Sequence, residues 1–297
     1  MKNNIKAHIA VLATTIFFSI NFTAVKFLID GDLIMPFSLN FLRISISAIL
    51  LWSFFIFKKE KSKVEKKDIG RIILCSITGI VFNQFLFIEG LSLSTPIHGA
   101  LLMLTTPILI TFFAASFLGE KLNRLKIIGL LLGITGSAFL ILSRSSNQRG
   151  TNIFLGDILI FLNAVSYTIY FIIVKPLMKK YSAITIIRLM FTFGFFIAIP
   201  FCWNQFTIIP WHNYSVVSFT VLGLIVIGGT TLAYMLNIYG INKLGASITG
   251  NYIYLQPVFA TIIAIGFHTD HLDLQKVLSA ILIFTGLYLA NKKTTNG

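Results

Sequence analysis

The chain has 297 residues, of which 56% are hydrophobic and only 11% are charged, and its mean hydropathy is +0.86. A soluble domain of this length does not need so much apolar surface, so the composition excludes a soluble globular protein. The formal net charge of +14 would suit a nucleic-acid partner, but the positions of the basic residues argue against one.

Ten apolar stretches are each long enough, at roughly 20 residues, to cross a bilayer as a helix. They cover residues 7–27, 38–57, 71–91, 96–118, 125–142, 153–174, 184–203, 215–239, 246–267 and 274–290. The stretches are continuous and about twice as long as the alternating segments of a membrane β-barrel, so we expect an all-α membrane protein with ten transmembrane helices. The first stretch is too long for the apolar region of a signal peptide, and we expect it to remain as a membrane helix. Short loops leave residues 1–297 as a single membrane domain.

The basic residues divide unequally between the two sides of this predicted topology. Eighteen Lys and Arg residues fall on the side of the termini, three fall on the other side, and Lys26, Arg43 and Arg188 lie within or beside the stretches. Such a bias predicts that both termini are cytoplasmic. We expect the membrane to be a plasma membrane, the inner membrane of a bacterium. The basic side chains then face anionic lipid headgroups, and we expect no nucleic-acid partner.

The sequence resembles itself at a separation of 150 residues. Gly90 matches Gly240, Pro107 matches Pro257 and Gly136 matches Gly286, while Lys26 matches Lys175 with a slightly different offset. Residues 1–143 and 152–293 are therefore predicted to be two five-helix repeats. Because five is odd, the first helix of each repeat starts on a different side, so the repeats are inverted and are expected to enclose a central cavity.

Polar side chains within the stretches are candidates to line that cavity, because polar groups in hydrocarbon usually face a cavity or another helix. The sixth stretch carries such residues at helical spacing, as do the eighth and ninth. The candidates for substrate binding are Asn21, Asn83, Gln84, His98, Asn163, Tyr167, Tyr170, Tyr234, Asn237, Asn251, Tyr252 and Gln256. Amides and phenols suit an uncharged or zwitterionic metabolite, whereas the alternative is that they only join helices, at about 0.6 kcal/mol each.

A few charged residues and prolines are candidates for coupling or gating. Glu89 is the acid most clearly inside a stretch and could exchange a proton, although it could equally be interfacial or structurally paired. Asp157 is expected at the membrane interface. Arg43 and Arg188 could attract anions at two related gates, or extend to the headgroups. Pro107 and Pro257 should kink equivalent helices, as bending points or as fixed kinks.

Other chemistry finds little support in the sequence. His268 and His271 flank Asp270 in a short loop, but two histidines without further ligands are a weak metal signal, so no metal is expected. There is no nucleotide-binding motif and no nucleophilic triad, so we expect neither a cofactor nor an enzymatic activity.

The order of the motifs resembles a known family. They are the segments at 19–26, from Pro36 to Arg43, from Phe85 to Pro96, and at 117–122 (Phe-Leu-Gly-Glu-Lys-Leu), with Gly129, Gly133 and Gly136 and the second-half matches Gly240, Pro257, Asp270 and Gly286. Nearly the whole chain is similar to the EamA-type branch of the drug/metabolite transporter superfamily. The resemblance implies a ten-helix permease that moves small metabolites by alternating access, often outward. The related four-helix multidrug exporters use a glutamate in the first helix, which is absent here, so their drug–proton mechanism is not transferred.

The expected function is therefore secondary transport, in which the protein exports or exchanges a small metabolite, such as an amino acid by family analogy, with protons as a candidate coupling ion. Two alternatives remain open: an integral membrane enzyme that acts on lipids, and a receptor or assembly partner that transports nothing.

Overall fold

The computed structural model describes residues 2–58, 64–118, 124–142, 150–244, 249 and 252–291, and all regular structure in these ranges is helical. The first half contains α1 (Lys2–Asp30), α2 (Pro36–Lys58), α3 (Lys66–Ser76), η1 (Ile77–Val81), α4 (Phe82–Leu93), α5 (Pro96–Met103), α6 (Thr105–Leu118) and α7 (Arg124–Leu142). The second half contains α8 (Ile153–Met178), α9 (Ala183–Thr207), η2 (Trp211–Asn213), α10 (Val216–Gly223), η3 (Leu224–Leu232), α11 (Ala233–Leu244), η4 (Tyr252–Leu255), α13 (Gln256–Gly266) and α14 (Leu274–Asn291). The expected all-α fold is confirmed.

Within the described ranges, six helices are long and apolar enough to cross a membrane, and three further apolar helices are shorter. The expected third and eighth stretches are each one continuous span, because α3, η1 and α4 run together, as do α10, η3 and α11. The expected fourth stretch is instead interrupted at Leu104, between α5 and α6. Pro107 explains this break, because its ring would clash with the carbonyl of Met103, where α5 ends.

Helix starts follow from local sequence. Ser182, Ser215 and Asn152 each precede a helix, and each side-chain oxygen accepts a hydrogen bond from the backbone N–H three residues later. At α5, Thr95 occupies the same capping position and Pro96 is the first helical residue, where a proline loses no helical hydrogen bond.

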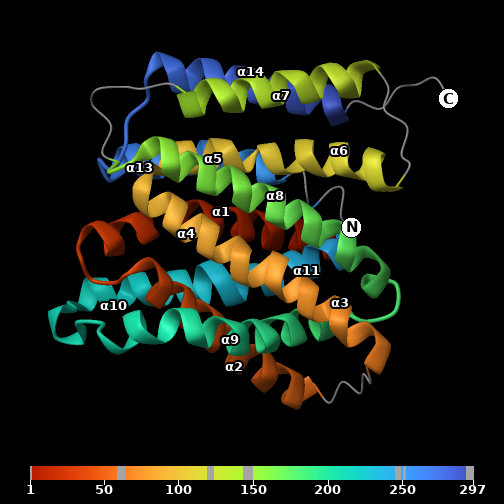
Figure 1. Cartoon of the computed structure of the whole chain (residues 1–297), viewed down its shortest axis with the longest axis vertical. Helices are drawn as coiled ribbons and strands as arrows, with labels where there is room; N and C mark the ends of the chain where they lie inside the picture. Colours follow the sequence, from red (N-terminus) through yellow and green to blue (C-terminus); the bar gives the residue numbers. More distant parts are fainter. Residues whose placement is uncertain are drawn as a thin grey trace.

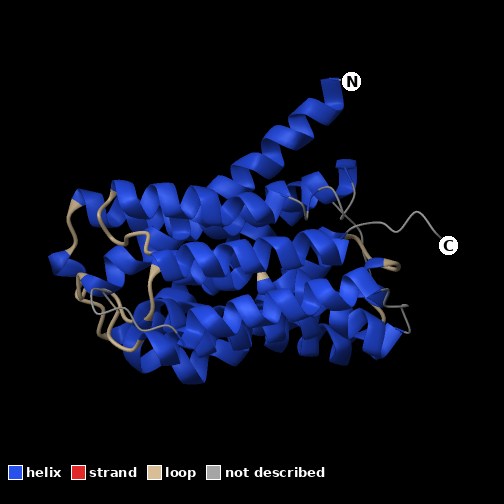
Figure 2. Ribbon diagram, turned by 90° about the horizontal axis from the view of Figure 1, so that it is seen from above, coloured by secondary structure: helices blue, strands red, loops and turns tan. Residues whose placement is uncertain are grey.

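The helices run between two ends of the molecule and are packed in layers (Figures 1 and 2). α7 and α14 lie along each other in an outer layer, above α5, α6 and α13, while α2 and α9 lie along each other on the opposite side. Between these layers, α8 packs against α3, α4, α5 and α6, whereas α1 packs against η3, α11 and α13. We call these groups the α8 bundle and the α1 bundle. The α8 bundle combines α8 of the second half with helices of the first half, and the α1 bundle combines α1 of the first half with helices of the second half.

Close contacts within the two bundles match one another at the repeat spacing. A Cβ added to Gly79 would lie 2.7 Å from the Tyr170 ring, and one added to Gly229 would lie 3.2 Å from Oδ1 of Asn21. Gly79 and Gly229 are 150 residues apart, while Asn21 and Tyr170 are 149 apart, the offset already seen for Lys26 and Lys175. The two bundles therefore have the same internal packing at these positions.

A feature that the sequence did not predict is a π-helical segment at the same place in each half. Residues 77–81, shifted by 150, become 227–231, which fall inside η3. A π-helix widens the turn and leaves some backbone carbonyls without their usual partner, and such segments are frequent at functional sites. In η3, the hydroxyls of Thr230 and Thr231 donate to the carbonyls of Ile225 and Val226, five residues earlier.

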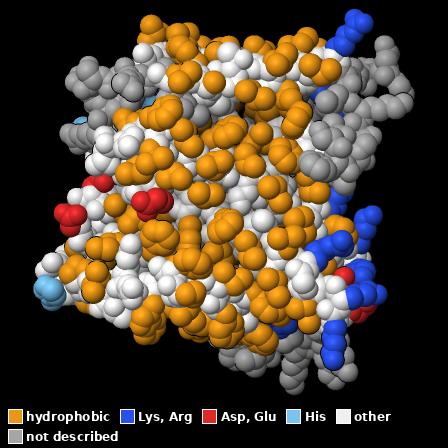
Figure 3. Space-filling model, viewed as in Figure 1, with side chains coloured by type: hydrophobic (Ala, Val, Ile, Leu, Met, Phe, Trp, Pro, Cys, Tyr) orange, Lys and Arg blue, Asp and Glu red, His pale blue; other side chains and the backbone are white. Residues whose placement is uncertain are grey.

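The surface distinguishes the two ends of the molecule. On the face in Figure 3, Lys and Arg gather along one edge and His lies at the opposite edge, while Asp and Glu are seen at both. At the basic end, Lys180 pairs with Asp68 at 2.9 Å, and the Tyr181 hydroxyl donates to the same carboxylate. Between the ends, large exposed side chains are predominantly apolar, as expected for a lipid-facing surface.

Candidate functional site

A polar stripe on α2 faces the π-helical segment η3. Arg43 Nε donates to Thr230 Oγ1 at 3.0 Å, and one turn further along, the Ser47 and Thr231 hydroxyls are 3.0 Å apart. Asn40 lies three residues before Arg43 and so shares this face of the helix. Thr230 is 14 residues from the start of α10, roughly 20 Å along a candidate membrane span, so the Arg43 side chain contacts the interior of that span.

The geometry of η3 prepares Thr230 to bind Arg43. The Thr230 hydroxyl donates its proton to the Ile225 carbonyl at 3.0 Å and so presents its oxygen as an acceptor to the guanidinium. A regular α-helix would offer the carbonyl four residues back, whereas the wider π-turn offers the carbonyl five residues back. The unusual helix thus sets the direction of the hydroxyl that holds Arg43.

Three amide side chains, from α1, α2 and α4, lie in the same region. Asn21 of α1 contacts Gly229, the neighbour of Thr230, and its Oδ1 has no hydrogen-bond partner. Gln84 of α4 and Asn40 of α2 are both buried, and neither amide nitrogen nor amide oxygen of either residue is partnered. The helices α2 and α4 meet nearby, where the rings of Phe37 and Phe85 are 5.1 Å apart.

Aromatic side chains complete the region. The rings of Tyr167 and Tyr170 on α8 are 5.4 Å apart, and Tyr234 on α11 packs edge-on against Phe18 and Phe191. Tyr234 is one turn beyond Thr230 and lies within electrostatic range of Arg43. We call Asn21, Asn40, Arg43, Gln84, Thr230 and Tyr234 the seam cluster. It combines one guanidinium, three amides, a hydroxyl and a phenol in an otherwise apolar interior.

Several predicted site residues also join helices. Asn163 Nδ2 donates to the Asn83 carbonyl at 2.5 Å, and Ser166 donates to the Thr78 carbonyl at 2.8 Å, so α8 is bonded to the η1 region. The Tyr252 hydroxyl is 2.7 Å from His8 Nδ1. These contacts fit the alternative considered from the sequence, in which polar groups link helices. The Oδ1 of Asn163, however, remains without a partner.

The remaining substrate-binding and coupling candidates differ in how deeply they are buried, and one of them is not described. The backbone carbonyl of Gln256 accepts from Ser19, and its side chain is buried at the start of α13. Glu89 on α4 and Asn237 on α11 are half-buried. Asn251 lies outside the described residues.

His98 belongs to a separate buried pair near the start of α8. Its Nδ1 lies 2.7 Å from Asp157 Oδ2, the Ser94 hydroxyl donates to the other oxygen of this carboxylate, and neither side chain of the His98–Asp157 pair is exposed. Asp157 lies four residues into α8, near the end of the span as expected, but it is buried there rather than exposed. Asp157 is ten residues before Tyr167, roughly 15 Å along α8, so this pair is not part of the seam cluster.

The two arginines expected to be equivalent differ in their surroundings. Arg188, near the start of α9, places its guanidinium over the Trp52 ring, 4.3 Å from the centroid. Arg43 reaches Thr230 instead. Pro107 and Pro257 do lie at interruptions, since α5 ends four residues before Pro107 and Pro257 is the second residue of α13, which directly follows η4. That the helices bend at Pro107 and Pro257 during transport stays a prediction.

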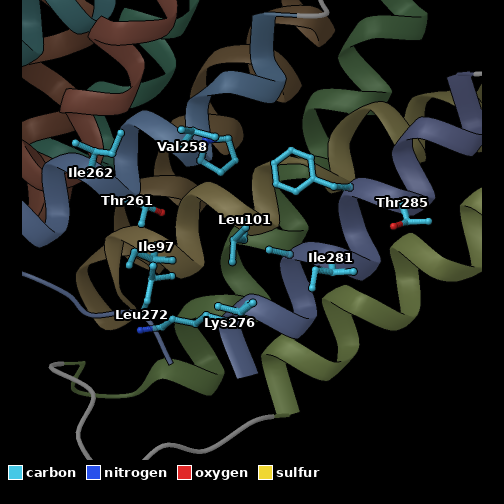
Figure 4. A pocket seen from close by; sticks show the side chains of 13 residues that line it. Ile97, Leu101, Val258, Thr261, Ile262, Leu272, Lys276, Ile281 and Thr285 are labelled. Atoms are coloured by element: carbon cyan, nitrogen blue, oxygen red, sulfur yellow. The ribbon is translucent and has the colours of Figure 1, made fainter. Parts of the chain in front are cut away.

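A lateral groove of about 550 Å³ lies between α5, α13 and α14 (Figure 4). Apolar side chains such as Leu101 and Ile281 line most of it, and Lys276 is at one end. The Lys276 ammonium is held by Asp270 at 2.7 Å and by the His271 carbonyl at 2.8 Å. Apart from Pro257, none of the predicted site residues lines this groove. Among the described residues there is no group of three or more His, Cys, Asp or Glu that could hold a metal.

Sequence reasoning missed Asn40, Ser47 and Thr230. The first two could have been found, because with Arg43 they occupy positions i, i+3 and i+7 of one helix face. Thr230 could not, because its role depends on the π-helical turn.

Comparison with known proteins adds the family. The sequence profile of the EamA-like transporter family matches residues 5–142 and again residues 154–292. The chain is similar to the uncharacterized transporter YetK of Bacillus subtilis, with 26% identity over 73% of this chain and 66% of that protein. It is also similar to YyaM of the same organism (24% identity, 97% and 94% covered) and to the WAT1-related protein At3g53210 of Arabidopsis thaliana (22%, 96% and 85%). A solved crystal structure superposes with a TM-score of 0.63 at 16% identity over 96% of both chains, so the fold is shared.

Proposed function

Because the chain belongs to the EamA-like transporter family, we propose that this multi-pass membrane protein is a secondary transporter that exports or exchanges a small metabolite by alternating access. The substrate would bind at the seam cluster, between the α1 bundle and the α8 bundle. Amino acids and related compounds are the first class to test.

The observation that carries this proposal is the matched packing of the two bundles. The contact of Gly79 with Tyr170 and that of Gly229 with Asn21 fall at equivalent positions of the two repeats. Two bundles with the same internal packing can exchange roles when one end of the molecule opens and the other closes. A site between them is then reached from each side in turn.

The proposed orientation places both termini in the cytoplasm and residues 1–143 and 152–293 as inverted repeats. The gathering of Lys and Arg at one end supports it, because cytoplasmic loops carry such an excess. In a variant without Cys75 and Cys202, single cysteines at Lys66 and Lys180 should react only from the cytoplasm of intact cells. Single cysteines at Asp32 and His212 should react from outside. Labelling of all four from one side would contradict the inverted arrangement.

Transport is tested by comparing metabolites in medium and cytosol of cells with and without the protein, followed by flux assays in proteoliposomes on the compounds that change. We expect at least one small metabolite to accumulate in the medium only when the protein is present. Specific binding without flux would instead favour the receptor alternative. An enzyme that acts on lipids is no longer a candidate, because the family is one of transporters.

Protons are proposed as the coupling ion, with Glu89 as the coupling group, because it is a half-buried carboxylate within a membrane span. A pH gradient should then drive flux through the unchanged protein but not through Glu89→Gln. Flux that ignores the gradient and survives this substitution would exclude Glu89 from coupling.

A further inference from the structure

We infer that the transported molecule carries an anionic group, a carboxylate or a similar small oxyanion, and that Arg43 with Asn40 forms the subsite that binds it. This inference rests on the proposed function and adds the chemical class of the substrate. It starts from the electrostatics of one buried side chain.

Arg43 is a buried positive charge without a counter-charge. Its side chain is only 5% exposed, its Nε donates to Thr230, and its Nη1 has no hydrogen-bond partner. No carboxylate of the described residues forms an ion pair with it. A neutral hydroxyl does not offset the cost of taking a guanidinium out of water, so the site is incomplete in electrostatic terms.

The acidic residues of the chain are committed elsewhere. Of the ten, Glu60 and Glu120 lie outside the described residues, which leaves eight. Five of these form ion pairs with lysines, namely Asp30, Glu65, Asp68, Asp270 and Asp273, and Asp157 lies within hydrogen-bond distance of His98 and Ser94. Asp32 is exposed beyond the end of α1, and Glu89 is half-buried on α4. A small anion from solution is therefore the natural partner of Arg43.

The amides beside Arg43 are also ready for a ligand. Asn40 is 1% exposed and Gln84 is 3% exposed, yet all four of their amide atoms lack partners. Buried polar groups in native proteins are almost always satisfied, so the unpartnered amide of Asn40, on the same face of α2 as Arg43, indicates a ligand site. An oxyanion could accept from Arg43 Nη1 and Asn40 Nδ2 together, while the amide of Gln84 is available to a second polar group of the molecule. Phenols and phenyl rings, such as Tyr234, would contact its apolar part.

The second arginine provides an internal comparison. Arg188 is the sequence equivalent of Arg43, but its guanidinium covers the Trp52 ring, and so it is already stabilised by a cation–π contact. Arg188 is therefore held in the contact between α2 and α9, whereas Arg43 faces η3 across the seam cluster. Arg188→Gln is therefore the matched control for Arg43→Gln.

The test measures binding to the purified full-length protein in nanodiscs. The probes are pairs that differ only at the acid group: acetate and acetamide, benzoate and benzamide, and amino acids and their amides, with chloride as a separate anion. Ligand-dependent thermal stabilisation and Trp fluorescence report binding. We expect carboxylates to bind, their amides to bind at least about tenfold more weakly, and Arg43→Gln to lose about 10- to 100-fold in carboxylate affinity while Arg188→Gln keeps it.

A second variant separates binding from structure. The Asn40 side chain makes no hydrogen bond in the structure, so Asn40→Ala should weaken carboxylate binding without lowering the melting temperature of the ligand-free protein. Equal binding of acids and amides, unchanged affinity in Arg43→Gln, stabilisation by chloride alone, or no binding by any probe would each overturn the inference. Equal flux of charged and neutral substrates would overturn the anion subsite but not the transporter proposal. Carboxylate binding without flux would support the subsite and overturn the transporter proposal.

Discussion

The buried pair of His98 and Asp157 allows a quantitative prediction about how the α8 bundle is held together. The Asp157 carboxylate accepts hydrogen bonds from Ser94 and His98, and these bonds connect α8 to the α4–α5 junction. Replacing Asp157 by Leu removes both acceptors and leaves two buried polar groups unpaired. Hydrogen bonds to a charged group contribute about 1.5–3 kcal/mol each, so two of them amount to roughly 3–6 kcal/mol. This range agrees with the cost of about 3–5 kcal/mol for removing one partner of a buried ion pair in other proteins.

The reverse expectation holds for the double variant. Replacing both His98 and Asp157 by Leu leaves only the Ser94 hydroxyl without its partner, so much of the loss should be recovered. The coupling energy between the two positions in a double-mutant cycle should then be at least about 2 kcal/mol.

The free energy of unfolding can be followed in mixed micelles titrated with SDS, using the fluorescence of Trp52, Trp203 and Trp211. Asp32→Asn is the matched control, because Asp32 is exposed, and it should change stability by less than about 0.5 kcal/mol. If Asp157→Leu costs no more than this control, or if the double variant is as unstable as the sum of the single ones, the reasoning about this pair is wrong.

Three further predictions concern packing and movement. Gly286→Ala should destabilise the protein by about 1–3 kcal/mol, because the new Cβ would lie 2.5 Å from the Gly129 carbonyl oxygen and 2.6 Å from the Gly133 nitrogen. Gly223→Ala is the control, because a Cβ there has no atom within 4 Å and should not destabilise the protein. Equal SDS midpoints of the two variants would refute this prediction. Pro107→Ala should let α5 and α6 join into one helix, so flux in proteoliposomes should fall while the protein still elutes as a folded species; undiminished flux would show that the break is not needed for transport. Trp52→Leu removes the ring under Arg188, a contact worth about 0.5–2 kcal/mol, and also the hydrogen bond from Trp52 Nε1 to Thr192. The loss in Arg188→Gln should not be additive with that of Trp52→Leu, and full additivity would show that the two residues do not act together.

Much of the fold could be predicted from the sequence, because bilayer thickness fixes the length of an apolar helix and the repeat marks equivalent positions. The interruption at Leu104 is also understandable from Pro107. The π-helical segments η1 and η3 were not predicted. In the structure, α8 packs against η1 in the third span, and α2 packs against η3 in the eighth span. No local pattern of residues specifies these contacts between distant segments.

The sequence predicted which polar residues share a helix face, but not which partners their side chains have. Spacing identified Asn163, Tyr167 and Tyr170 as one stripe, but not that Asn163 donates to a backbone carbonyl of the neighbouring helix. Sequence equivalence suggested that Arg43 and Arg188 have the same role, and the structure separates them through Thr230 and Trp52. Which polar groups are satisfied is decided by contacts between segments far apart in the chain, and a sequence alone does not provide them.

The exchange of α1 and α8 between the bundles has a consequence for a chain severed between α7 and α8. Neither fragment contains a complete bundle, since each keeps one helix that belongs beside the other fragment's helices. Fragments made apart would leave Asp157 without His98 in one and Asn21 without Gly229 in the other, and each would have to find its counterpart by diffusion within the lipid. The covalent connection replaces that search with a high local concentration. It thereby fixes a one-to-one stoichiometry that two independent chains would reach only when they are produced in equal amounts.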